Sequence, residues 1–219
     1  MSKLVIVGAG DVARLAHYYF SRDSQHEVVA FAVDRPYLHA EEFLGLPLIA
    51  LDELAARFPP EGHRAFVAMS YAAMNRRRAE KYAYMKELGY QLVSYVSSRC
   101  SFLSDTAPGD NCLILEDNTI QPFVRIGNDV ILWSGNHIGH DSVIEDHCFI
   151  SSHVVVSGHV RVEAYCFIGV NATLHNSITI AQGTLIGAGA VITKDTLPLG
   201  VYVPRRAERL DKKSDEIEL

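Results

Sequence analysis

The chain has 219 residues, 48% of them hydrophobic, and a formal net charge of −6 at pH 7. This composition is that of a folded globular protein and excludes a disordered one. The acidic balance argues against a nucleic-acid partner, because such proteins carry a basic surface. No apolar run approaches the roughly 18 residues of a membrane span, and the apolar run at 4–7 is too short for a signal peptide. We therefore expect a cytoplasmic protein whose four cysteines are reduced thiols.

Strands and helices alternate over the first 96 residues. An apolar strand at 4–7 ends at Gly8-Ala9-Gly10, and a helix with one apolar stripe follows this turn. A second strand, at 28–33, ends at Asp34. Two more strands are expected at 65–69 and 92–96, with a helix at 72–88 between them. Because such alternation forms a parallel sheet, residues 1–96 predict a small nucleotide-binding α/β domain.

An aliphatic residue occurs at every sixth position of the second half. The unbroken series is Ile114, Ile120, Ile126, Leu132, Ile138, Ile144, Ile150, Val156, Val162, Ile168, Leu174, Ile180, Ile186 and Ile192. A helix with a period of 3.6 residues cannot keep one residue in six on a face. Three short strands joined by tight corners can, and successive coils then stack about 4.8 Å apart. This predicts an all-β parallel β-helix over 112–204, with a connection at 97–111 and a charged tail at 205–219.

Short motifs in both halves match one family. They are Gly8-Ala9-Gly10, Asp34, the hexads, Gly139-His140-Asp141-Ser142, Phe167-Ile168-Gly169-Val170-Asn171 and Ile186-Gly187-Ala188-Gly189-Ala190. Over nearly its full length the chain resembles the sugar acyltransferases grouped with sialic acid O-acetyltransferase and with bacterial nucleotide-amino-sugar N-acetyltransferases. The resemblance implies a Rossmann-like domain followed by a left-handed β-helix, in a homotrimer with sites between subunits. It also implies acetyl transfer from acetyl-CoA to an amine or hydroxyl of a sugar, with a nucleotide-linked sugar as the substrate.

The resemblance places the general base at His140 and its partner at Asp141. Histidine suits proton transfer near neutral pH. His140 lies two residues past the interior Ile138, at an expected corner of the coil. Adjacent side chains on a flat strand point to opposite faces, so only a corner allows residues 140 and 141 to meet. The alternative is that His140 is a solvated corner histidine.

The resemblance also assigns two sets of binding residues. The set expected to bind CoA is Gly158, Gly169, Val170, Gly187, Ala188 and Lys194. The set expected to bind the nucleotide-linked substrate is Gly8, Gly10, Asp11, Asp34, Asn75 and Arg77. Two alternatives stay open: Lys194 as a solvated lysine, and Arg76-Arg77-Arg78 as a solvated helix face. Asp11 departs from the family's usual glycine and would lie beside a diphosphate.

The other histidines of the repeat region and three of the cysteines have expected structural positions. His147, His153 and His159 share one phase of the hexad and are expected at successive corners, with His159 one coil beyond Asp141. No two coil histidines have the separations of the zinc ligands in γ-class carbonic anhydrases, so no metal is expected. Three cysteines are expected to form an inward stack of small apolar groups: Cys112, Cys148 and Cys166.

Three functions remain as hypotheses. The first is an acetyl-CoA-dependent N-acetyltransferase that acts on a nucleotide-linked amino sugar for surface polysaccharide synthesis. The second is a sugar O-acetyltransferase of the sialic acid type, and the third is a sugar-nucleotide binding protein without activity. The fingerprint Gly8-x-Gly10-x-x-Ala13 is also typical of nicotinamide enzymes, but the α/β half is too short for the usual two mononucleotide halves.

Overall fold

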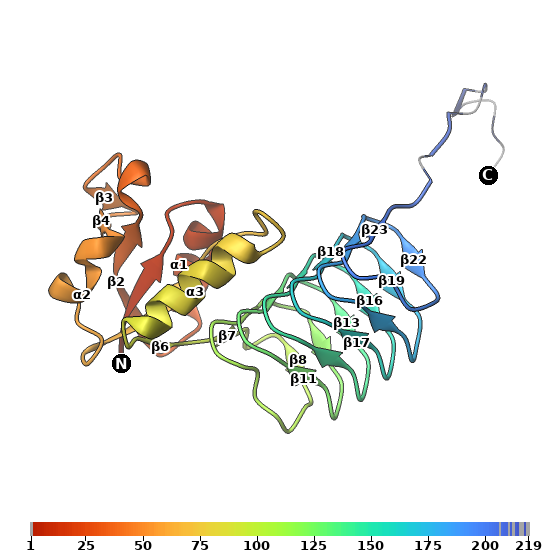
Figure 1. Ribbon diagram of the computed structural model, residues 1–219, viewed down its shortest axis with the longest axis horizontal. Helices are drawn as coiled ribbons and strands as arrows, with labels where there is room; N and C mark the ends of the chain where they lie inside the picture. Colours follow the sequence, from red (N-terminus) through yellow and green to blue (C-terminus); the bar gives the residue numbers. More distant parts are fainter. Residues whose placement is uncertain (1, 206, 210, 212, 215–216, 218–219) are drawn as a thin grey trace.

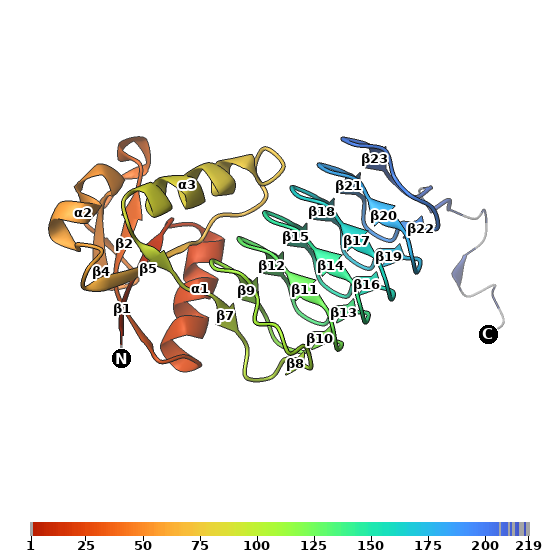
Figure 2. The same ribbon diagram turned by 60° about the horizontal axis from the view of Figure 1, so that its bottom comes forward.

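The computed structural model describes residues 2–205, 207–209, 211, 213–214 and 217. An α/β domain at the N-terminal end is followed by a long stack of triangular coils (Figures 1 and 2). No helix in the described part of the chain is both long and apolar enough to cross a membrane. The expected tail at 205–219 lies partly outside the described residues.

The N-terminal domain is built on one mainly parallel sheet in the order β3-β4-β2-β1-β5-β6. Its strands are β1 Ser2–Val7, β2 His26–Val33, β3 Glu42–Phe43, β4 Leu46–Ala50, β5 His63–Val67 and β6 Gln91–Leu92. Only the β3–β4 pair is antiparallel. The helices are α1 Asp11–Arg22, α2 Leu54–Arg57 and α3 Arg76–Glu87, with short 3₁₀ turns η1 Arg35–Tyr37 and η2 Leu51–Glu53.

Alternation along β1 divides the core of this domain into two layers. Leu4 and Ile6 belong to the cluster that contains Phe20 of α1, whereas Val5 and Val7 belong to the cluster that contains Met85 of α3. Helices α1 and α3 therefore cover opposite faces of the sheet, as expected when neighbouring side chains of a strand point in opposite directions.

The second half is a β-helix of three parallel ladders. The first is β7 Tyr95–Val96, β9 Leu113–Ile114, β12 Ile131–Leu132, β15 Phe149–Ile150, β18 Phe167–Ile168, β21 Leu185–Ile186 and β23 Val201–Tyr202. The second is β8 Ser101–Phe102, β10 Thr119–Ile120, β13 His137–Ile138, β16 Val155–Val156, β19 Thr173–Leu174 and β22 Val191–Ile192. The third is β11 Arg125–Ile126, β14 Val143–Ile144, β17 Arg161–Val162 and β20 Thr179–Ile180.

The hexad series fills the interior of this prism, as predicted. Its aliphatic side chains form one buried cluster with the three cysteines, each of which has no exposed surface. From Ile114 to Ile186, the residue three positions after each aliphatic turns the corner with a positive φ, as at Asp141 (59°), His147 (62°), His153 (57°) and His159 (58°). The expected corner positions of these histidines are therefore confirmed.

The structure differs from the sequence-based expectations at the junction of the two halves. The expected strand at 92–96 is two strands: β6 belongs to the N-terminal sheet, and β7 already pairs with β9 of the β-helix. The strand β8 pairs with β10, so the ladders begin before residue 112. Helix α3 begins at Arg76 rather than at residue 72, because Ala73, Met74 and Asn75 have φ values of 52°, 53° and 65°. The strand β4 was not foreseen.

A buried ion pair joins the two halves. Arg78 has no exposed surface, so it is not part of a solvated helix face. Its Nε donates to Asp129 Oδ1 at 3.0 Å, and its Nη2 donates to the carbonyl of Asp129 at 2.9 Å. Asp129 also accepts hydrogen bonds from Asn111 Nδ2 at 2.7 Å and His147 Nδ1 at 2.9 Å. These contacts fix α3 against the first coils.

Candidate active site

His140 and Asp141 meet at an exposed corner of the β-helix. His140 Nδ1 lies 2.7 Å from Asp141 Oδ2, and the two side chains are 52% and 41% exposed. The left-handed conformation of Asp141 turns its side chain back towards His140, and aspartate tolerates this conformation better than most residues. The predicted contact between residues 140 and 141 is therefore present. With Nδ1 facing the carboxylate, Nε2 is the nitrogen that can accept a proton.

Two residues of the next coil surround His140. A Cβ built at Gly158 would lie 2.7 Å from His140 Nε2, so the absence of a side chain at Gly158 makes room for the imidazole. The His159 ring is also close, with its centroid 5.0 Å from that of His140 and an angle of 88° between the ring planes. Its Nε2 is 3.8 Å from Asp141 Oδ2. The expected proximity of His159 to Asp141 is thus confirmed.

The residues expected to bind CoA lie along two different edges of the prism. His140, Gly158, Asn176 and Lys194 occupy equivalent positions after β13, β16, β19 and β22, and we call this line the His140 edge. The second line runs beside the ends of β12, β18 and β21. We call it the Trp133 edge, and its members are Trp133, Gly169, Val170, Gly187 and Ala188. The two lines therefore follow different ladders of the same chain.

Close packing accounts for the glycines of the Trp133 edge. A Cβ at Gly169 would lie 2.5 Å from the backbone nitrogen of Ala188, and one at Gly187 would lie 3.0 Å from Val203 Cγ1. Val170 and Ala188 remain exposed at the surface of this edge. Lys194 and Asn176 are likewise exposed on the His140 edge.

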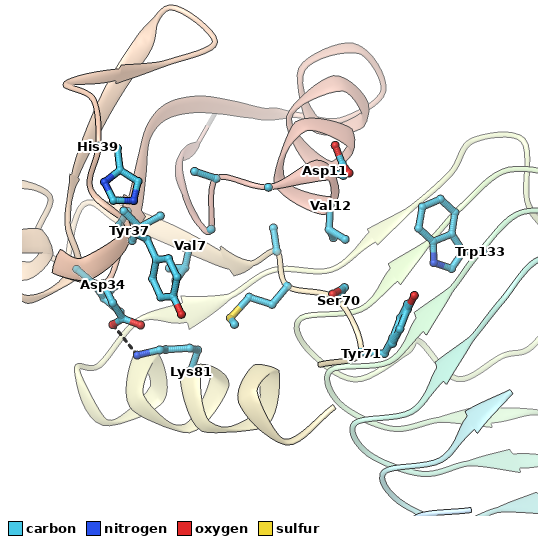
Figure 3. Close-up of a pocket in the computed structure, with 18 residues that line it drawn as sticks. Val7, Asp11, Val12, Asp34, Tyr37, His39, Ser70, Tyr71, Lys81 and Trp133 are labelled. Carbon is cyan, nitrogen blue, oxygen red and sulfur yellow. Dashed lines mark hydrogen bonds and ion pairs between the residues drawn. The ribbon is translucent and has the colours of Figure 1, made fainter. Parts of the chain in front are cut away.

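A pocket of about 740 Å³ opens at the ends of the N-terminal strands, next to the β-helix (Figure 3). The turn Gly8-Ala9-Gly10 and Asp11 form one wall. Asp34 and Lys81 lie at one end, where Lys81 Nζ is 2.6 Å from Asp34 Oδ1. Trp133 lies at the other end of the pocket and belongs to the β-helix.

The turn beside this pocket suits a phosphate group. Gly8 has a φ of 126°, and a Cβ there would lie 2.6 Å from the carbonyl oxygen of Ala68. Gly10 precedes α1 without a side-chain cap, and a Cβ there would meet nothing within 4 Å. The first amide groups of a helix have no partner within it, and the open space beside Gly10 leaves room for an anion near those of α1. The Asp11 carboxylate is exposed and pairs with Arg14 at 3.2 Å.

Four of the six residues expected to bind the nucleotide line this pocket: Gly8, Gly10, Asp11 and Asp34. The position of Asn75 corrects its assignment, because this residue is fully buried and donates to the Cys166 carbonyl at 3.1 Å. It links the two halves and cannot reach a ligand. Arg77 is exposed on α3 and is not among the residues that line the pocket.

Sequence reasoning missed several residues of the pocket. Tyr37 and His39 come from the segment after Asp34, and Lys81 comes from the middle of α3. Trp133 was also missed, although it is the chain's single tryptophan and follows an interior hexad residue. Among the described residues, its Nε1 is the buried side-chain nitrogen without a hydrogen-bond partner. Such a donor is costly to bury unpaired.

The cysteines take no part in this site. Burial raises the pKa of the Cys112 thiol to about 12, and burial also raises the pKa of Cys148 well above its usual value. A thiol acts as a nucleophile only in its thiolate form. Cys112 and Cys148 are therefore core residues, as expected.

Comparison with known proteins supports the repeat and the fold. Residues 123–158 match the family described as "Bacterial transferase hexapeptide (six repeats)". The acyl-[acyl-carrier-protein]–UDP-N-acetylglucosamine O-acyltransferase of Paracoccus denitrificans is 31% identical over 77 residues, which are 35% of this chain and 30% of that protein. The enzyme of the same name from Helicobacter pylori is 30% identical over 108 residues, 43% of this chain and 40% of that protein. The chain thus spans less than half the length of these curated relatives.

Solved structures match the whole architecture. The acetyltransferase domain of PglB from Neisseria gonorrhoeae has a TM-score of 0.82 and 23% identity, and the match covers 96% of this chain and all of that domain. PerB from Caulobacter crescentus, in complex with CoA and GDP-perosamine, has a TM-score of 0.81 and 23% identity over 93% of this chain and 95% of that one. At these identities the likeness establishes a shared fold.

Proposed function

We propose that the protein is an acetyl-CoA-dependent N-acetyltransferase that acts on a nucleotide-linked amino sugar. The observation that carries this proposal is the contact of 2.7 Å between His140 Nδ1 and Asp141 Oδ2 on an open edge of a β-helix. Such a pair has the parts of a general base and its orienting carboxylate. The fold shared with the PglB acetyltransferase domain supports the choice of acyl transfer.

His140 would remove the proton as the acceptor attacks. The amino group of the sugar forms a bond to the thioester carbonyl carbon while Nε2 of His140 takes the proton from the nitrogen. Collapse of the tetrahedral intermediate breaks the carbon–sulfur bond, and His140 returns the proton to the leaving CoA thiolate. Asp141 accepts the Nδ1 hydrogen bond throughout, so it holds the ring and stabilises the charged imidazolium.

The His140 edge supports CoA as the donor. Gly158 and Asn176 continue the line of His140 along the prism, and Lys194 stands three coils away, a distance of about 14 Å at the usual strand spacing. If the pantetheine arm of CoA were extended along this line, the phosphates of CoA would lie near the Lys194 ammonium group. The complexes of relatives support the same donor, since one PglB structure contains acetyl-CoA and the PerB structure contains CoA.

The pocket beside Gly8 and Gly10 supports an acceptor substrate that carries a nucleotide, which this pocket would bind. Its glycine turn and the start of α1 offer amide groups to a diphosphate, and Asp34 lies at the end where a ribose would be held. GDP-perosamine in the PerB complex is a nucleotide-linked amino sugar. We therefore propose a substrate of this chemical class for the present protein.

The two edges support a homotrimer whose sites lie between subunits. The pocket adjoins the Trp133 edge of its own chain, whereas the base lies on the His140 edge. A neighbouring copy that presents its His140 edge to this pocket would complete the site. It would also bring the two groups of expected CoA-binding residues to the same ligand.

Acetylation of a hydroxyl is the second candidate, because the curated relatives transfer an acyl group to oxygen. The test is the rate of CoA release from acetyl-CoA with UDP-, GDP- and dTDP-linked amino sugars, and with their hydroxyl counterparts. We expect transfer to one amino sugar class and a loss of at least about 100-fold for His140→Asn. His175→Asn, an exposed histidine outside the pair, serves as the control and should retain the rate. Transfer only to the hydroxyl counterparts would favour the second candidate, and an unchanged rate for His140→Asn would refute both.

A further inference from the structure

A cluster of three possible metal ligands lies on the His140 edge. His140, Asp141 and His159 each offer one atom, and all three atoms lie within 4.8 Å of one another. We propose that these side chains form a binding site for a divalent transition metal ion, Zn²⁺ above all, and that the bound ion inhibits the protein. The inhibitory part of the proposal rests on the proposed function, whereas the binding itself does not.

The donor set and its spacing suit zinc. Two imidazole nitrogens and one carboxylate oxygen are typical zinc ligands, and they bind at about 2.0 to 2.2 Å. Ligand atoms on a tetrahedral ion are then about 3.3 Å apart. The observed separations lie on either side of this value: 2.7 Å from Asp141 Oδ2 to His140 Nδ1, and 3.8 Å to His159 Nε2. All three side chains are exposed, so small rotations can equalise these distances and leave a fourth position to water.

The backbone beneath the cluster is held in place. The His159 amide donates to the carbonyl of His140 at 2.9 Å, which ties the two coils together at the ligands themselves. The His140 amide donates to Gln121 Oε1 at 2.9 Å. Asp141 and His159 both occupy left-handed corner positions, with φ values of 59° and 58°. The Cα positions of the three ligands are therefore fixed before the ion binds, so binding costs little conformational entropy.

The histidine separations that exclude a zinc site like that of γ-class carbonic anhydrases do not exclude this arrangement, which uses a carboxylate as well. His140 and His159 differ by one coil plus one residue, and the corner brings the second nitrogen towards the shared carboxylate. The site is therefore visible only once the coil register is known.

A bound ion would prevent His140 from acting as a general base. Coordination through Nδ1 uses the lone pair of that nitrogen, so neutral His140 must then carry its proton on Nε2. Nε2 becomes a hydrogen-bond donor and cannot accept a proton from the acceptor amine. The ion would also take the Asp141 carboxylate, which otherwise stabilises the imidazolium. Inhibition would follow without any change of fold.

Calorimetric titration of the full chain with ZnCl₂, without substrates, tests the site. The visible spectrum of bound Co²⁺ in the same protein reports on tetrahedral coordination. The informative variants are His159→Asn and Asp141→Asn, because asparagine also tolerates the left-handed corner conformation. His175→Asn is the matched control, since His175 is exposed and its Nδ1 contacts only the neighbouring Asn176 carbonyl at 3.2 Å.

We expect one ion per chain and a tetrahedral Co²⁺ spectrum for the wild type and for His175→Asn. Affinity should fall by more than about tenfold in both ligand variants, because even groups that only support a ligand contribute about that much. Equal affinity in His159→Asn and in the wild type, or no binding at all, would overturn the proposal. If zinc binds as expected but the protein shows no acetyl transfer, the proposed function fails and the metal site stands.

Discussion

At the scale of the residue, the proposed chemistry depends on the corner positions of the β-helix. From Asp117 to Gly189 the residue at each corner has a positive φ. The side chains that share one edge of the prism differ from coil to coil. On the His140 edge, the imidazole of one coil lies over the glycine of the next. The contact between His140 and Asp141 could be predicted from the sequence, because a corner is the only place where adjacent side chains meet. The role of Gly158 as space for a ring could not, since it depends on how the coils stack.

Replacement of this glycine should displace the base without harm to the fold. A methyl group at Gly158 would lie 2.7 Å from His140 Nε2, and the ring can rotate away because it is an exposed side chain. We expect Gly158→Ala to lower the rate of acetyl transfer by at least about tenfold, because misplacement of a catalytic group by about 1 Å can cost about 100-fold. The melting temperature should stay within a few degrees of the wild type.

Gly62→Ala is the control, since a Cβ there meets nothing within 4 Å. A rate for Gly158→Ala equal to that of Gly62→Ala would show that the position of the His140 ring does not matter for transfer.

At the scale of the element, α3 illustrates what the sequence left open. Arg76, Arg77 and Arg78 are adjacent, and nothing in the sequence distinguishes them. In the structure Arg77 is exposed, whereas Arg78 is fully buried against Asp129 of the β-helix. The hexad spacing predicted the coils between Ile114 and Ile192 because it repeats a local rule, whereas the first coil, which contains β7 and β8, has no such spacing and was not predicted. The contacts between α3 and the coils join residues 51 and 70 positions apart and follow no such rule.

Loss of the buried arginine should destabilise the protein strongly. In Arg78→Met the buried Asp129 carboxylate loses the guanidinium group and keeps only its hydrogen bonds from Asn111 and His147, and removal of one partner of a buried ion pair typically costs about 3–5 kcal/mol. Urea denaturation measures this change in the free energy of unfolding. The double variant Arg78→Met, Asp129→Asn should recover part of the loss, because no charge is then left unpaired. A loss below about 1 kcal/mol in the single variant would show that the ion pair does not hold the two halves together.

A second contact between the two halves, at the end of α1, offers a pH-dependent test. Asp23 there contacts Tyr95 and Ser98 at the start of the β-helix. Hydrogen bonds from the Ser98 amide and from Tyr95 lower the pKa of Asp23 below its usual value of 3.8. A lowered pKa in the folded state means that the charged carboxylate stabilises the fold above about pH 3.8 and that this contribution is lost as the pH falls further. Asp23→Asn should therefore cost about 1 kcal/mol near neutral pH.

Urea denaturation of Asp23→Asn and of the wild type, from pH 7 down to pH 3, measures this difference. The two curves of stability against pH should converge below about pH 3.8. A difference between the two proteins that grows as the pH falls would contradict the assignment.

At the scale of the whole molecule, the site is divided between two edges of one prism. The pocket adjoins Trp133, and the proposed base His140 lies on the His140 edge, after a different ladder. Residues Gly8, Gly10 and Asp34 could be placed at the pocket from the turn that follows each strand. Tyr37, Lys81 and Trp133 could not, because they reach the pocket from a 3₁₀ turn, a helix and a coil that only the tertiary fold brings together. The division itself predicts that two copies of the chain complete each site.

Complementation between two inactive variants tests whether the pocket of one copy works with His140 of another. His140→Asn removes the base, and Gly10→Leu fills the open space at the start of α1. Each variant alone should be inactive. A refolded equal mixture should regain about one quarter of the wild-type activity, because random cyclic assembly places an intact pocket beside an intact His140 at about one site in four. No recovery in mixtures shown to contain mixed oligomers would mean that the pocket and His140 do not act across subunits.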